Sequence, residues 1–220
     1  MTREITTFWP AWRRVYQAEA CGWLRDQAAD SGTSIVTSLP DVSEVPPHKF
    51  ELWRDWFIGT AAQIMNWVPT DGQVIFFQSD VRHHHIWVDK SYLLQCAAAN
   101  AKANLVWHKI VCRRPPGTIA AGRPSYSHML CFTRGTVVTP ERPGPDVLPD
   151  AGVMSWSRAM GAKACMVACR YLRDETRTRV VVDPFCGEGA VLAAANQLGL
   201  ASIGVDLSAR RCKAALRQVL

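Results

Sequence analysis

Hydrophobic residues along the chain follow two alternating patterns. One is a short run of β-branched and aromatic residues, as in VIFF at Val74 to Phe77, which is typical of a strand buried on both faces. The other is a longer segment with apolar residues at helical spacing, of which the clearest follows the Pro46-Pro47 pair. Its apolar face contains Phe50, Trp53, Phe57, Ile64 and Trp67.

Taken in order, these patterns predict a nearly regular alternation of strands and helices. The expected strands cover residues 15–18, 34–37, 74–77, 105–111, 127–132, 179–183 and 202–206. The expected helices cover residues 20–29, the segment after Pro47, 91–101, 161–173, 189–198 and the C-terminal residues. We expect strands 105–111 and 127–132 to pair. This alternation predicts an α/β fold with a doubly wound sheet.

The 220 residues, 48% of them hydrophobic, are enough to bury one good core. The stretch TVVTPERPGPDVLPDAG at 136–152 is dense in proline and is interpreted as a surface linker. We therefore expect one domain over residues 1–220, with halves 1–135 and 153–220 joined by this linker.

Membrane and export signals are not evident in the sequence. No apolar run approaches the roughly 20 residues that span a bilayer, and the N-terminus MTREITTFWPAWRR contains no apolar signal region. We therefore expect a soluble intracellular protein of the cytosol or nucleus, or of an organelle reached by a signal that the sequence does not reveal, without a membrane partner.

Cysteine and histidine spacing argues against a metal site. The eight cysteines are scattered without CxxC pairs, which predicts reduced core thiols. His83, His84 and His85 follow a strand end, and three adjacent imidazoles on a regular element cannot all face one ion, so we expect a loop. His108 falls within an expected strand and is interpreted as a core histidine.

The net charge of +6 is unevenly distributed. Between Lys90 and Pro140 there are seven Lys or Arg residues and no Asp or Glu. Such a segment is either a solvated face or a surface for a polyanion such as nucleic acid.

The most informative motif is DPFCGEG at 183–189. The preceding strand brings Asp183 to the sheet edge where α/β proteins bind ligands, and Gly187 and Gly189 allow the backbone to pass close to a bound molecule. The third glycine of a dinucleotide fingerprint and the lysine of a phosphate loop are missing. Asp206 ends the next strand, where a carboxylate accepts bonds from ribose hydroxyls. The set suits S-adenosylmethionine; the alternative is a turn used only for packing, with Asp206 as a helix N-cap.

The order of motifs resembles the permuted β-group of class I S-adenosylmethionine-dependent amino-methyltransferases, which includes adenine-N6 and cytosine-N4 enzymes. VYQAEACGWL, SIVTSLPD, LVWHKIV with YSHMLCF, GAKACMVACRYL and DPFCGEG are similar to that family's motifs in the same order, over nearly the whole chain. The resemblance implies a Rossmann-like, seven-stranded mixed sheet with circularly permuted strands. Residues 1–135 would form the target side and residues 153–220 the cofactor side.

The resemblance also implies roles for individual residues. Glu19 would approach the adenine of the cofactor, and Lys163 its methionine tail. The implied cofactor-binding set is Glu19, Lys163, Asp183, Pro184, Phe185, Cys186, Gly187, Glu188, Gly189, Asp206 and Leu207. The implied catalytic set, in which a side chain and a carbonyl accept the hydrogens of the target amine, is Ser38, Leu39, Pro40 and Asp41.

Asp41 departs from the family pattern, which has an aromatic residue stacking on a flipped base at this position. A carboxylate cannot stack, although it can accept a hydrogen bond or a proton. Either a different base or atom is methylated, or another aromatic residue stacks, or the substrate is not a nucleobase. The replacement stackers, each with a core role as the alternative, are Trp9, Trp53, Trp56 and Tyr126.

Substrate recognition is expected near the loop at 112–125. Arg113, Arg114, Arg123 and Tyr126 are the candidate substrate-binding residues, with solvated loop arginines as the alternative. Because the chain has room for only a short recognition region, we expect RNA recognised by shape, or recognition through a protein partner, before a DNA site. The departure at Asp41 also leaves open methylation of a protein side chain or small molecule, and a non-catalytic binding subunit.

Overall fold

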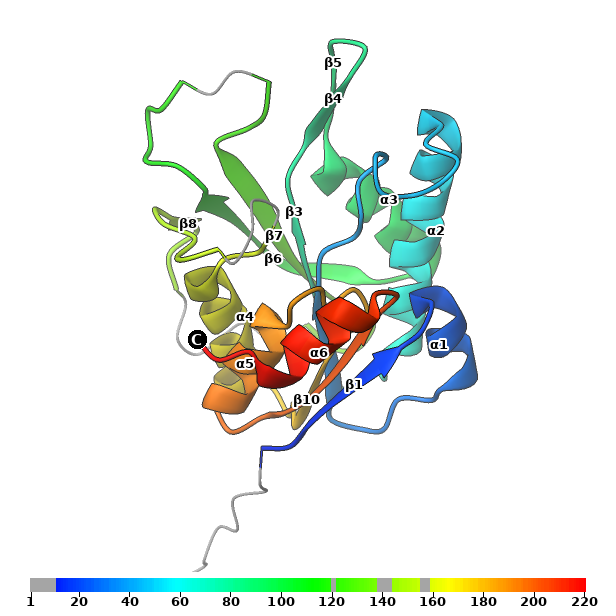
Figure 1. Ribbon diagram of the computed structural model, residues 1–220, viewed down its shortest axis with the longest axis vertical. Helices are drawn as coiled ribbons and strands as arrows, with labels where there is room; N and C mark the ends of the chain where they lie inside the picture. Colours follow the sequence, from blue (N-terminus) through cyan, green and yellow to red (C-terminus); the bar gives the residue numbers. More distant parts are fainter. Residues whose placement is uncertain (1–10, 120–121, 138–143, 155–158) are drawn as a thin grey trace, which may run out of the picture.

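The computed structural model describes residues 11–119, 122–137, 144–154 and 159–220. A central sheet runs through the molecule and helices cover both of its faces (Figure 1). The strands of this sheet are β1 (Arg13–Gln17), β2 (Thr33–Thr37), β3 (Val74–Gln78), β6 (Asn104–Cys112), β7 (Tyr126–Thr133), β8 (Val147–Leu148), β9 (Val180–Asp183) and β10 (Ala201–Asp206). The helices are α1 (Ala20–Asp26), α2 (Phe50–Trp67), α3 (Lys90–Ala101), α4 (Ala162–Glu175), α5 (Ala190–Gln197) and α6 (Ala209–Arg217).

The strands lie in the order β1-β10-β9-β2-β3-β7-β6-β8. The first five in that order are parallel, and β7 is antiparallel to both β3 and β6. Strand β2 pairs directly with β9, so the beginning and the end of the chain meet in the middle of one sheet. This arrangement confirms the α/β, doubly wound, mixed sheet.

The sheet has eight strands among the described residues, whereas seven were expected. The additional strand is β8, a two-residue strand that pairs with β6 through Val147 and Leu148. It lies inside the stretch 136–152, which the sequence analysis interprets as a linker. The sequence did not predict this strand, because two residues are too few to show the alternation of apolar and polar positions and because prolines are uncommon within strands.

Neighbouring residues of the central strands face opposite layers, as the pleat of a β-strand requires. Ile35 and Phe76 pack with Trp53 and Phe57 of α2, in the layer that also contains α1 and α3. Val36 and Ile75, one position away, pack with residues of α4 and α5 on the other face. All five residues of β3 are buried, as the run VIFF predicts.

The loop expected at His83–His85 is met in part, because only His83 belongs to a strand, whereas the core position expected for His108 was wrong. Residues 81–88 form a hairpin of β4 (Val81–His83) and β5 (Ile86–Val88), in which His84 and His85 make the turn with φ angles of 47° and 67°. His108 is exposed, because the β6 surface is covered much less than that of β7. Its ring is hydrogen-bonded to His128, with His108 Nε2 3.0 Å from His128 Nδ1.

None of the described helices combines the length and the apolar character that a membrane span requires. All eight cysteines are free thiols, and five of them are buried. Trp9, one of the proposed stacking residues, lies outside the described residues.

Candidate active site

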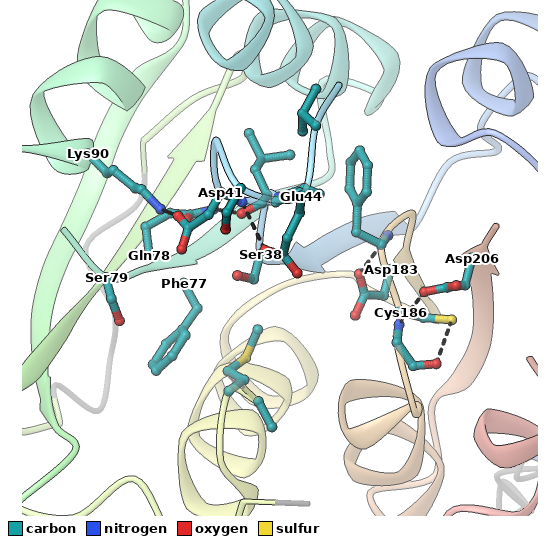
Figure 2. Close-up of a pocket in the computed structure, with 18 of the residues that line it drawn as sticks. Ser38, Asp41, Glu44, Phe77, Gln78, Ser79, Lys90, Asp183, Cys186 and Asp206 are labelled. Carbon is teal, nitrogen blue, oxygen red and sulfur yellow. Dashed lines mark hydrogen bonds and ion pairs between the residues drawn. The ribbon is translucent and has the colours of Figure 1, made fainter. Parts of the chain in front are cut away.

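A cavity of about 850 Å³ opens at the carboxyl ends of the parallel strands. Its walls include Leu39, from the loop after β2, and Gly187, from the turn after β9. Because β2 and β9 are parallel neighbours, their carboxyl ends reach the same edge of the sheet. Figure 2 shows Ser38 and Asp41 from the first loop facing the same space as Asp183, Cys186 and Asp206.

The two glycines of the DPFCGEG turn serve different purposes. Gly187 has φ of 52°, and a Cβ built on it meets nothing within 4 Å, so its backbone borders open cavity space. Gly189 has φ of 85°, and a Cβ there would lie 2.7 Å from the Cα of Ala215 in α6. Gly187 therefore fits the predicted close approach to a bound molecule, whereas Gly189, which also lines the cavity, is required for packing against α6.

Asp183 is a buried carboxylate at the end of β9. Its Oδ1 accepts hydrogen bonds from Thr37 Oγ1 at 2.7 Å and from the backbone N–H of Phe185 at 3.1 Å. Burial raises the pKa of Asp183 to about 7, with a smaller contribution from the charge of Asp206. A cationic group in the cavity would stabilise the ionised form of this carboxyl group.

Asp206 holds the glycine turn from the neighbouring strand. Its Oδ2 accepts from the N–H of Gly187 at 3.2 Å, and its Oδ1 from the N–H of Ser208 at 2.7 Å. Ser208, not Asp206, is the N-cap of α6. Asp206 therefore fixes the turn around Gly187 while its side chain lines the cavity.

The remaining predicted cofactor residues divide into two groups. Glu19 lines the cavity and caps α1, accepting from Cys21 N at 2.9 Å and Gly22 N at 2.6 Å. Lys163 is not among the lining residues, because it lies at the exposed start of α4 and its ammonium pairs with Asp150. The others that line the cavity as expected are Pro184, Phe185, Cys186, Glu188 and Leu207.

The loop Ser38-Leu39-Pro40-Asp41 forms the opposite wall. The indole N–H of Trp53 donates to the Pro40 carbonyl at 3.0 Å, which ties this loop to α2. The Leu39 carbonyl has only a long contact of 3.5 Å from Gln78 Nε2. Of the two carbonyls, the one at Leu39 has more remaining capacity to accept a hydrogen from a ligand.

Asp41 is paired with Lys90, the first residue of α3, and Figure 2 shows this ion pair at the cavity wall. The Lys90 side chain is only 2% exposed, whereas that of Asp41 is 23% exposed. The ammonium also lies 5.6 Å from the centre of the Trp53 ring. Sequence reasoning missed Lys90, because a lysine at a helix start carries no local sign of burial.

The predicted replacement stackers are distributed unequally. Trp56 lines the cavity, and its ring meets Phe185 edge to face, with centroids 6.2 Å apart. Trp53 is fully buried in the core. Tyr126 is not among the lining residues and packs against His128, with centroids 5.3 Å apart.

Basic residues gather at the outer part of the cavity. Arg113, Arg114 and Arg123 all line it, as expected of substrate-binding residues. Arg113 is held in place by a bond from Nη1 to the carbonyl of Ala159 at 3.2 Å. Arg82, from the hairpin β4–β5, also lines the cavity and was not anticipated.

A second polar cluster lies where the hairpin joins α3. Asp80, Asp89 and His128 each offer an atom that could bind a metal ion, and these atoms lie within 4.8 Å of one another. Asp80 already accepts from Lys90 N at 2.9 Å and from His128 Nε2 at 3.1 Å, and Asp89 is the N-cap of α3. These bonds give the cluster a structural role at the start of α3.

No protein-family model and no curated protein matches the sequence. Similarity to solved structures is extensive. A "Putative DNA Modification Methylase" from Thermus thermophilus, in complex with S-adenosyl-L-methionine, matches with a TM-score of 0.71 at 16% identity, over 92% of each chain. The cytosine-N4-specific PvuII DNA methyltransferase matches with a TM-score of 0.71 at 13% identity, over 94% of this chain and 87% of that one. The M1.HpyAVI-SAM complex matches with a TM-score of 0.62 at 14% identity, over 93% and 98%. The chain therefore has the Rossmann-like fold of these methyltransferases.

Proposed function

We propose that the protein is an S-adenosylmethionine-dependent methyltransferase that modifies an exocyclic amino group of a base in nucleic acid. One observation carries this proposal. A single cavity is lined both by the Gly187 turn with Asp206 and by the Ser38–Asp41 loop. A cofactor on the first wall and an amine on the second would therefore lie next to each other, which is the arrangement that direct transfer requires.

The cofactor wall fits an adenosine with a cationic tail. The space in front of Gly187 is open, and the cavity volume of about 850 Å³ is within the usual range for small-molecule sites. Asp206 and Glu19 present carboxylates to this space. Asp183 also lines the cavity, and a positive charge bound nearby would favour the deprotonated form of its carboxyl group. S-adenosylmethionine, when bound, supplies an electrophilic methyl group on a sulfonium.

The target wall would orient the amine. The Ser38 hydroxyl and the Leu39 carbonyl accept its hydrogens, which aims the nitrogen lone pair toward the cofactor wall. The Pro40 carbonyl is already bonded to Trp53 and keeps the loop in place. Asp41 is engaged by Lys90, so this carboxylate positions the loop rather than stacking on or deprotonating a base.

The cavity favours direct attack of the substrate nitrogen on the methyl group over a mechanism in which a cysteine of the protein first attacks the base. Burial raises the pKa of the Cys186 thiol far above its ordinary value. Cys186 is the one cysteine among the described residues that line the cavity. Since the thiolate is the nucleophilic form, the cavity offers no activated cysteine for covalent attack on a base.

Nucleic acid is the substrate class favoured by charge. Five arginines line the cavity, namely Arg82, Arg113, Arg114, Arg123 and Arg211, and guanidinium groups bind phosphates well. RNA was expected before DNA, but the "Putative DNA Modification Methylase" from Thermus thermophilus is matched over 92% of both chains. A short recognition region is thus compatible with either nucleic acid, and a protein partner that supplies recognition is a further proposal.

Methyl transfer from labelled cofactor into total DNA, RNA and protein tests the proposal. We expect the label in a nucleic acid fraction, at an amino nitrogen of a base. Label confined to protein would overturn the substrate class. Failure to bind S-adenosylmethionine at tens of micromolar in calorimetry would overturn the enzymatic function.

A further inference from the structure

We propose that the hairpin β4–β5 is a wedge that enters duplex nucleic acid beside the target base, with Ile86 as the inserted side chain. This proposal rests on the function proposed above and adds the form of substrate, a duplex from which the base is extruded.

The hairpin stands at the rim of the cavity. Figure 1 shows it projecting from the body of the molecule beyond the carboxyl end of β3. Val81 and Arg82 at its foot line the cavity, so the cavity wall continues directly into the hairpin. A strand of nucleic acid that delivers a base into the cavity would therefore meet the hairpin.

Beside its turn, the hairpin carries apolar side chains that the described residues leave exposed. Ile86 is 70% exposed and Trp87 is 42% exposed. His84 and His85 complete the turn. Next to its turn the hairpin thus presents a branched aliphatic side chain, Ile86, which is a type of residue that proteins insert between stacked bases.

The hairpin is anchored by contacts along its length, which a wedge requires. The indole N–H of Trp87 donates to Asp80 Oδ2 at 3.0 Å, and the same carboxylate accepts from the N–H of Lys90. His83 stacks on Phe50 of α2, with ring centroids 4.3 Å apart and planes 11° apart. These contacts fix the direction of the hairpin before any ligand binds, which lowers the entropic cost of insertion.

Charge around the hairpin suits a polyanion. Residues 81–88 contain one arginine and three histidines but no acidic residue. Across the cavity, Arg114 and Arg123 belong to the loop between β6 and β7, which also projects from the body in Figure 1. The two projections would contact phosphates on either side of the site, and Ile86 would enter the duplex from the hairpin.

The physical reason for a wedge is the cost of extruding a base. A base that leaves the duplex breaks its stacking and pairing, and an apolar side chain in the gap offsets part of that loss. A single-stranded base has far less stacking to lose. Loss of the wedge should therefore impair modification of duplexes selectively.

The test compares native with heat-denatured nucleic acid. Labelled methyl transfer is measured into DNA from a bacterium lacking DNA methylation and into unmodified transcribed RNA, each in both forms. The variant is Ile86→Ala, with Ile86→Met as the conservative replacement. The control is Leu216→Ala, which removes a similarly exposed (52%) apolar side chain from α6. Calorimetry with S-adenosylmethionine verifies that each variant keeps its fold and cofactor site.

Ile86→Ala is expected to lower transfer into native duplex about 10-fold and transfer into denatured strands less than about 2-fold. Ile86→Met and Leu216→Ala should resemble the wild type on both. Three results would overturn the wedge but leave the proposed function intact. They are an equal loss of methyl transfer by Ile86→Ala into native and denatured nucleic acid, no loss into either, and wild-type transfer into single strands alone. The wild type could instead form a concentration-dependent dimer that Ile86→Ala abolishes, while the ratio of transfer into native and denatured nucleic acid stays the same. That result would assign Ile86 to self-association and overturn the wedge. Absence of wild-type transfer into any nucleic acid would overturn both proposals.

Discussion

The ammonium group of Lys90 pairs with the carboxylate of Asp41, 49 positions away in the sequence, at the wall of the cavity. Lys90 is enclosed by the rings of Trp53 and Phe57, whereas Asp41 faces the cavity. The pair neutralises a buried cation and connects the loop Ser38–Asp41 to α3.

The two members of this pair should differ in their contribution to stability. Asp41→Asn leaves an ammonium group uncompensated in the core and should lower the free energy of unfolding by about 3–5 kcal/mol. Lys90→Met leaves a carboxylate that can turn toward the cavity and be hydrated, and should cost roughly 1 kcal/mol or less. Urea unfolding of both single variants and of the double variant measures this difference. Equal losses for the two single variants would show that Lys90 is solvated in solution.

Asp183 should make stability depend on pH. Its pKa is raised in the folded state to about 7 from an ordinary value of 3.8, so the folded protein binds the proton more tightly than the unfolded chain. The free energy of unfolding should therefore fall as pH rises from about 4 to about 7, by at most roughly 4 kcal/mol at about 1.4 kcal/mol per pKa unit.

Asp183→Asn removes this dependence while keeping an acceptor for Thr37 and for the N–H of Phe185. In the absence of ligand, the variant should match the wild type near pH 4 and exceed it in stability near pH 8. Urea unfolding at both pH values measures the effect. A difference between the two proteins that stays constant with pH would contradict the assigned shift.

The two glycines of the turn should respond differently to alanine. Gly187→Ala places a methyl group in the cavity and should weaken S-adenosylmethionine binding at least 10-fold, with a stability loss of about 1–2 kcal/mol from its positive φ. Gly189→Ala forces a methyl group against the backbone of Ala215 and should destabilise the fold by more than that. Calorimetry and thermal unfolding separate the two effects. Unchanged cofactor affinity in a folded Gly187→Ala variant would place the ligand elsewhere.

Ser38 should affect turnover without affecting the cofactor. Ser38→Ala removes the hydroxyl that, in the proposed function, accepts a hydrogen of the target amine, and should lower kcat about 100-fold. S-adenosylmethionine affinity should change less than about 2-fold, because the hydroxyl belongs to the opposite wall. Single-turnover methyl transfer with saturating cofactor provides the measurement. A variant with full activity would transfer the orienting role to the Leu39 carbonyl alone.

The sequence by itself determined most of the strands and helices and their order, although not β4, β5 and β8. Runs such as VIFF predicted the strands because burial on both faces leaves a continuous apolar stretch, and helical spacing predicted α2 from residues that do contact the core. The DPFCGEG turn was recognisable because positive φ angles and close packing require glycine at Gly187 and Gly189.

The tertiary structure alone decided which side chains meet. Three contacts join residues from different elements, namely the ion pair of Lys90 with Asp41, the hydrogen bond of His108 with His128, and the cavity wall shared by Arg82 and Arg123. The spacing of apolar residues within one element does not encode such contacts. It also separated Lys163 and Tyr126 from the cavity, although their motifs precede and follow lining residues. The physical reason is that the spacing of hydrophobic residues along the sequence indicates which face of one element is buried. The charges and hydrogen bonds of a site depend instead on how several elements pack together.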